Sequence, residues 1–121
     1  EEKSTFNLDR QKTTVNHGVD MKPKHSQSRN GDMAEHYAVT WLWDNGYEVF
    51  TNAGCTGMVD MIAMDREGNT IKIDVKSDTW SERQKKKVHK HGRTDKQKEQ
   101  GVQIVSYNPD TRKLRFVEHR E

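Results

Sequence analysis

The residues most suited to chemistry in this sequence are two aspartates and a lysine on neighbouring predicted strands. The stretch TIKIDVKSD, residues 70–78, alternates apolar and charged residues, which is typical of a strand with one buried face. Asp74 and Lys76 share its charged face, and Asp60 lies on the strand predicted before it. Paired carboxylates are hard oxygen ligands for Mg²⁺, and a nearby lysine supplies a compact positive charge. The spacing therefore indicates a divalent-metal site beside a phosphate group.

The turn between the two strands predicts how these residues face each other. The tripeptide REG at 66–68 fits a three-residue hairpin loop with glycine in the left-handed third position, which pairs Asp65 with Asn69. Counting outward places Asp60 opposite Asp74 on one sheet face, with Cβ atoms about 4.5–5.5 Å apart. Two carboxylates placed in this way repel each other, so a compensating cation is expected.

A simpler interpretation is that both aspartates are solvated and neutralised by Lys72 and Lys76. Aspartate is depleted in strands, however, and the segment VDMIAM around Asp60 is otherwise apolar. We therefore favour the metal site for the group taken together. The prediction depends on the register, because a slip of one residue would move every side chain to the other face.

The rest of the sequence predicts a mixed α/β domain that would position these residues. Apolar residues recur at helical spacing from Ala34 to Leu42, which predicts a helix over 31–45 with Asn30 as N-cap and Gly46 at its end. A second, short helix is expected, capped by Thr94 and ending near Gly101. Strands are expected at 47–51, 58–65, 69–77, 102–107 and 112–119, with a basic loop at 78–93. The order α-β-β-β-α-β-β predicts a largely antiparallel central sheet with flanking helices.

Composition limits the class of protein. The chain has 121 residues, 30% hydrophobic and 33% charged, with a mean hydropathy of -1.19, which predicts one domain with polar segments outside its core. Residues 1–28 are expected to form a polar arm and 29–121 the domain. The single cysteine excludes an intrachain disulfide and suits a reducing cytoplasm. No apolar run approaches the roughly 20 residues that span a bilayer, so no membrane partner is expected.

The net charge is only +2, but basic residues are concentrated between Arg83 and Lys98, with eight basic residues against one acidic residue. Such a local excess favours a polyanionic partner. The alternative is a solvated loop, which could also become ordered on binding. The candidate contacts to the polyanion are Lys85, Lys86, Lys87, Lys90, Arg93 and Lys96.

The order and spacing of these motifs resemble the PD-(D/E)XK nuclease superfamily. The matching pieces are Glu35 in GDMAEHYA, Asp60 in GMVDMIA, and Asp74 and Lys76 in KIDVKS. The resemblance covers about residues 30–116 and is greatest to archaeal Holliday-junction resolvases and small phage-type endonucleases. One departure is Val59, which stands where the motif name has proline.

The resemblance implies a restriction-endonuclease-like fold and a Mg²⁺-dependent endonuclease that cuts DNA, with Mn²⁺ able to substitute and no organic cofactor. Asp60, Asp74 and the Val75 carbonyl would bind the metal, and Lys76 would position the attacking water. Glu35 would bind a second metal or a metal-bound water, and Gln97 would border the site. An intracellular protein of phage or mobile-element origin is also suggested.

Two alternatives stay open. One is a Holliday-junction resolvase that acts as a homodimer on branched DNA, and the other is a nucleic-acid-binding module that does not cut. Intact acids and the lysine argue against the second. A domain of this size is expected to show modest sequence specificity unless its arm or a dimer partner reads the bases.

Overall fold

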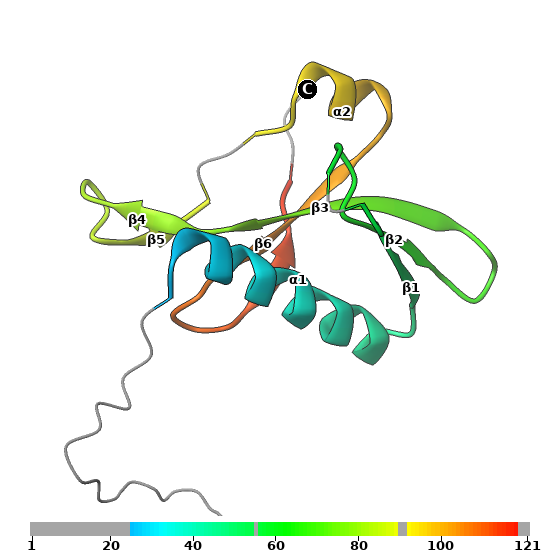
Figure 1. Ribbon diagram of the computed structural model, residues 1–121, viewed down its shortest axis with the longest axis horizontal. Helices are drawn as coiled ribbons and strands as arrows, with labels where there is room; N and C mark the ends of the chain where they lie inside the picture. The colour runs from blue at the N-terminus through cyan, green and yellow to red at the C-terminus, as the bar shows by residue number, and fades with distance from the viewer. Residues whose placement is uncertain (1–24, 55, 90–91, 119–121) are drawn as a thin grey trace, which may run out of the picture.

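The structure is a computed structural model that describes residues 25–54, 56–89 and 92–118, and most of the predicted polar arm lies outside these ranges (Figure 1). A five-stranded sheet has the strand order β1-β2-β3-β6-β7, and β4 and β5 form a separate two-stranded sheet. Among the described strand pairs, β3 and β6 run parallel and the other four pairs are antiparallel, so the predicted mixed, largely antiparallel sheet is confirmed. The elements are α1 (Gln27–Asp44), β1 (Glu48–Thr51), β2 (Met61–Met64), β3 (Thr70–Ser77), β4 (Thr79–Ser81), β5 (Lys86–Val88), α2 (Asp95–Glu99), β6 (Gln103–Tyr107) and β7 (Leu114–Phe116).

The core lies between α1 and one face of the large sheet. Small residues at helical spacing on α1 allow a close approach to β3 and β6. The buried set is Ala34, Ala38, Leu42, Met61, Ala63, Ile73, Val75, Val105 and Tyr107. Because side chains alternate along a strand, Asp74 lies on the opposite face from Ile73 and Val75, where it contacts Gln97 of α2. In Figure 1, α1 and α2 lie on opposite sides of the large sheet.

Helix α1 begins earlier than predicted. Ser26 is the N-cap, with its hydroxyl accepting from the Arg29 amide at 3.1 Å, so the prediction of Asn30 as the cap was wrong. Residues 27–30 are helical although they carry no apolar stripe, since the first turn is largely exposed and needs none. The predicted end holds, because Gly46 has φ +88° and its amide donates to the Trp43 carbonyl at 3.0 Å.

The predicted register of the β2–β3 hairpin is confirmed over the four pairs from Met61↔Ile73 to Met64↔Thr70. The Asp65 amide donates to the Asn69 carbonyl at 2.9 Å, as the turn predicts. Strand β2 is shorter than expected, however, and Asp60 lies just outside it. The Asp60 amide donates to the Ile73 carbonyl at 2.8 Å, so Asp60 and Met61 both face Ile73, as in a β-bulge. The expected direct pairing of Asp60 with Asp74 is replaced by this arrangement.

The segment 78–93, expected to be a loop, contains the β4–β5 hairpin. Its register pairs Thr79 with Val88 and Ser81 with Lys86. Lysine-rich composition concealed these strands, because cross-strand pairing rather than an apolar alternation defines them. No helix in the described part of the chain is long and apolar enough to cross a membrane.

Candidate active site

The Asp60 carboxylate lies just before β2 and is held by a hydrogen bond from a backbone amide of β3. The Val75 amide donates to Asp60 Oδ2 at 2.7 Å. The pKa of Asp60 is raised to about 7, chiefly by burial and also by the neighbouring Asp74 and Glu35 carboxylates, while the hydrogen bond from the Val75 amide opposes the rise. Asp60 therefore lies in a group of carboxylates where a second negative charge is unfavourable.

Asp74 is buried, at 6% exposed, on the face of β3 that carries α2. Its Oδ2 accepts a hydrogen bond from Gln97 Nε2 at 2.9 Å, and Lys76 Nζ lies 3.4 Å from the same oxygen. A buried carboxylate is costly without such partners. One charged and one neutral donor thus hold Asp74 in a fixed orientation beside Asp60.

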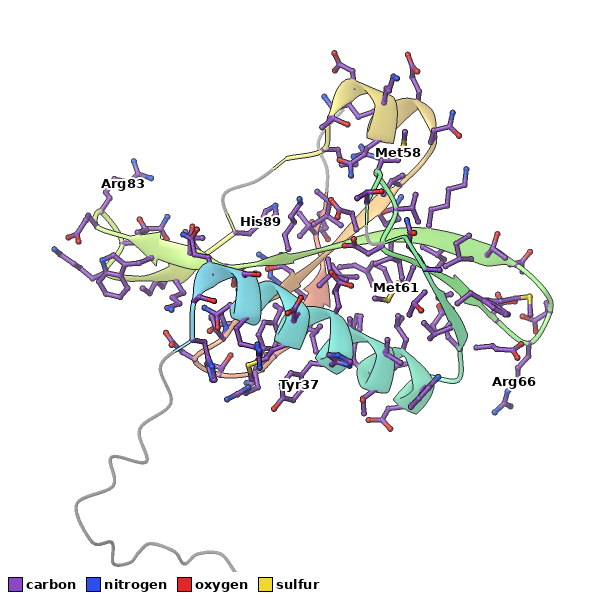
Figure 2. The ribbon with its side chains drawn as sticks, in the orientation of Figure 1. Tyr37, Met58, Met61, Arg66, Arg83 and His89 are labelled. Atoms are coloured by element: carbon purple, nitrogen blue, oxygen red, sulfur yellow. The ribbon has the colours of Figure 1, made fainter. Side chains whose placement is uncertain are left out.

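Gln97 connects α2 to the carboxylates. Its side-chain Nε2 also donates to the Met58 carbonyl at 3.0 Å, just below α2 in Figure 2. Its Oε1 accepts from the Thr94 amide at 3.0 Å, while the Thr94 hydroxyl accepts from the Gln97 amide at 3.1 Å. This is a capping box, so the start of α2 is fixed by the same side chain that contacts Asp74.

Glu35 lies on α1, and the charge of Asp74 affects its pKa. Burial raises the pKa of Glu35 above its ordinary value, and Asp32 and Asp74 add to the rise while His36 opposes it. The charge of Asp74 thus acts on Glu35, although the Glu35 side chain is itself exposed on α1. Its role as a ligand stays a prediction.

Sequence reasoning missed Asn52, which shapes the loop before Asp60. Its Nδ2 donates to the Thr56 carbonyl at 2.7 Å and to the Val59 carbonyl at 2.9 Å, and its Oδ1 accepts from the Gly54 amide at 2.9 Å. The signal was present in the sequence, since asparagine two residues before glycine favours an Asx turn. Asn52 thus fixes the backbone that leads into Asp60.

The predicted basic contacts do not form one cluster. Lys85, Lys86 and Lys87 lie on or beside the β4–β5 hairpin, whereas Lys96 is exposed on α2. Arg93 Nη1 donates to the Val102 carbonyl at 3.3 Å and is only partly exposed. Lys90 lies outside the described residues.

The donor set fits a hard divalent cation. Among the described residues, no three histidine, cysteine, aspartate or glutamate side chains lie close enough to hold a metal by themselves. Mg²⁺ needs fewer, because it commonly keeps several waters and binds one or two carboxylates together with a substrate phosphate. The raised pKa of Asp60 beside Asp74 indicates a pair of carboxylates that a cation would stabilise.

Comparison with solved structures finds the same architecture in the bacterial homing endonuclease I-Ssp6803I. The TM-score is 0.61 at 20% sequence identity, over 77% of this chain and 69% of that one. The chain has a restriction-endonuclease-like fold. The predicted fold class is therefore confirmed, while the closer resemblance to resolvases stays a prediction. No protein-family model and no curated protein sequence matches the chain.

Proposed function

We propose that this protein is a metal-dependent endonuclease that hydrolyses phosphodiester bonds in DNA. The proposal rests on one observation. Asp60, Asp74 and Lys76 lie together at one end of the β2–β3 hairpin, and Gln97 donates a hydrogen bond to Asp74. The fold shared with a homing endonuclease supports the same chemistry. If Asp74 were merely a solvated surface residue, it would not be buried and would not need hydrogen-bond donors from both Gln97 and Lys76.

Each residue of the site has a definable task. Asp60, Asp74 and the Val75 carbonyl would hold Mg²⁺ or Mn²⁺. The ion would lower the pKa of a bound water and neutralise charge on the phosphate. The amide of Val75 keeps Asp60 oriented, and Gln97 does the same for Asp74. These contacts arrange the ligands before the substrate arrives.

Lys76 would hold the attacking water and offset negative charge that develops on phosphorus. Its ammonium group lies 3.4 Å from Asp74 Oδ2, and its side chain is 40% exposed, so it borders both the carboxylates and solvent. Preorganised positive charge at this position stabilises the transition state more than the ground state. Glu35 would orient a further water or bind a second ion.

The basic residues would contact the DNA backbone. Lys85, Lys86 and Lys87 follow the active strand along the chain, and Lys96 lies on α2, whose Gln97 reaches Asp74. Contacts of this type are independent of sequence and weaken as salt rises, because binding releases counterions. The remaining predicted contacts, Lys90 and Arg93, belong to the same proposal.

The test compares wild type and Asp74→Ala on supercoiled plasmid, nicked DNA, linear duplex and a four-way junction, each with Mg²⁺, Mn²⁺ or EDTA. We expect cutting only with a divalent metal and none with the variant. Asp44→Ala, an exposed aspartate at the end of α1, is the matched control. Preference for the four-way junction would favour a dimeric resolvase, and binding without cutting would favour a non-cleaving module.

A further inference from the structure

The β4–β5 hairpin is joined rigidly to the active strand. Asp78 lies between β3 and β4, two residues after Lys76. Its amide donates to the Tyr107 carbonyl at 2.7 Å, and its buried carboxylate accepts from the buried Ser106 hydroxyl. The base of the hairpin is therefore fixed to β6. Figure 1 shows β4 and β5 extending from the end of β3, away from the body of the domain.

The tip of the hairpin is a closed turn. The Lys85 amide donates to the Ser81 carbonyl at 2.7 Å, and the Gln84 amide donates to the Ser81 hydroxyl at 3.2 Å. Lys85 Nζ and Glu82 Oε2 are 3.1 Å apart across the turn. These contacts leave Arg83 and Gln84 exposed at the end of the hairpin. Figure 2 shows Arg83 at this end, far from the domain body.

The charge and width of the hairpin match duplex DNA. Residues 79–88 contain four basic residues and one acidic residue. A two-stranded ribbon fits the major groove, which is about 12 Å wide. Arginine can donate two hydrogen bonds to O6 and N7 of guanine, and glutamine can form two hydrogen bonds with N6 and N7 of adenine. Arg83 and Gln84 are therefore the side-chain types that read bases from this groove.

We propose that the β4–β5 hairpin enters the major groove on one side of the cleaved phosphate, where Arg83 and Gln84 contact base edges. The inference rests on the proposed action on DNA. Seven residues lead from Lys76 to Arg83. At about 3.3 Å per residue they span at most about 23 Å, which corresponds to about seven base pairs at 3.4 Å each. The contacts then fall within about seven base pairs of the cut, and the domain reads sequence without its arm or a partner.

The test selects bound duplexes from a pool with random sequence, with Ca²⁺ in place of Mg²⁺. Wild type should enrich guanine or adenine in one window of a few base pairs, and mapping of cleavage in Mg²⁺ should place that window on one side of the cut. The double variant Arg83→Ala with Gln84→Ala should lose this enrichment and bind the selected DNA roughly tenfold to hundredfold more weakly. The control is Arg66→Ala, since Arg66 is exposed at the opposite end of the molecule (Figure 2).

A second variant keeps the test decisive if the double variant disrupts the structure of the hairpin. Arg83→Lys keeps the charge but loses the planar two-point contact, so it should lower the guanine preference while keeping most of the affinity for unselected DNA. The proposal is overturned if wild type enriches no bases in such a window, or if both variants enrich the same bases as wild type. Enrichment that depends on Arg83 without any cutting would support the hairpin's role and reject the nuclease function.

Discussion

Replacing Asp60 by asparagine should stabilise the metal-free protein while abolishing its activity. The Asp60 pKa of about 7 lies above its ordinary value of 3.8, so the folded state holds this proton more tightly than the unfolded state does. Converted in full, a rise of this size corresponds to about 4 kcal/mol. Because Asp60 is only half-buried, solvent screening reduces the expected effect to about 1–2 kcal/mol. The neutral variant keeps an oxygen for the Val75 amide and lacks the charge.

The direction of the pH dependence follows from the raised pKa. Below about pH 4, Asp60 is protonated in both the folded and the unfolded state and does not destabilise the fold. As pH rises from about 4 to about 7, its destabilising effect on the folded state grows. In EDTA, the free energy of unfolding of wild type should therefore fall relative to Asp60→Asn across this range. At pH 8 the variant should melt roughly 4–8 °C higher for each kcal/mol gained.

Urea and thermal denaturation of both proteins in EDTA, from pH 4 to pH 8, measure this difference. Excess Mg²⁺ should reduce or reverse it, since a ligand that binds only the folded wild type stabilises that protein alone. The reasoning would be refuted if the variant were no more stable than wild type at pH 8, or if the difference did not shrink towards pH 4.

Three other predictions separate the tasks of neighbouring residues. Lys76→Ala should lower the rate of single-turnover cleavage about 100-fold or more, while DNA affinity stays within a few-fold of wild type. The control is Lys72→Ala, on the same face of β3 and hydrogen-bonded to Gln100, which should cut normally. Equal losses of cleavage rate in both variants would contradict the role assigned to Lys76. Gln97→Ala should cost about 1–3 kcal/mol of stability and also lower the affinity for Mn²⁺, because it leaves Asp74 with one donor fewer. Thr94→Ala removes only the cap and should cost about 1 kcal/mol with metal affinity unchanged, so calorimetric titration of both variants checks the distinction. Lys85→Ala with Lys86→Ala should make the salt dependence of DNA binding shallower by about one to two phosphate contacts, measured as the slope of log Kd against log salt; an unchanged slope would remove these residues from the interface.

The parts of the fold that depend on local chemistry could be predicted from the sequence. The loop REG at 66–68 carries its register signal within three residues, and the Met61–Met64 pairing follows it. Thr94 is likewise the N-cap of α2, as expected, because a capping box is a local motif.

The parts that depend on tertiary contacts could not. The displacement of Asp60 from the ladder reflects a bulge, which adds one residue without a distinctive sequence signal. Gln97 gave only a weak signal, since its contacts to Asp74 and Met58 join residues 23 and 39 positions apart. The β4–β5 hairpin was hidden by its charge, which is the property that the proposed contact with DNA would use.

The most direct test of the nuclease site is cleavage of a supercoiled plasmid by wild type and by Asp74→Asn. Asparagine keeps an oxygen for Gln97 and removes one charge from the carboxylate pair, so the fold should be retained. We predict that wild type nicks or linearises the plasmid in Mg²⁺, that EDTA stops the reaction, and that the variant is inactive in both. Equal cleavage by the two proteins, or cleavage by wild type in EDTA, would contradict the assignment of Asp60, Asp74 and Lys76 as a metal-dependent active site.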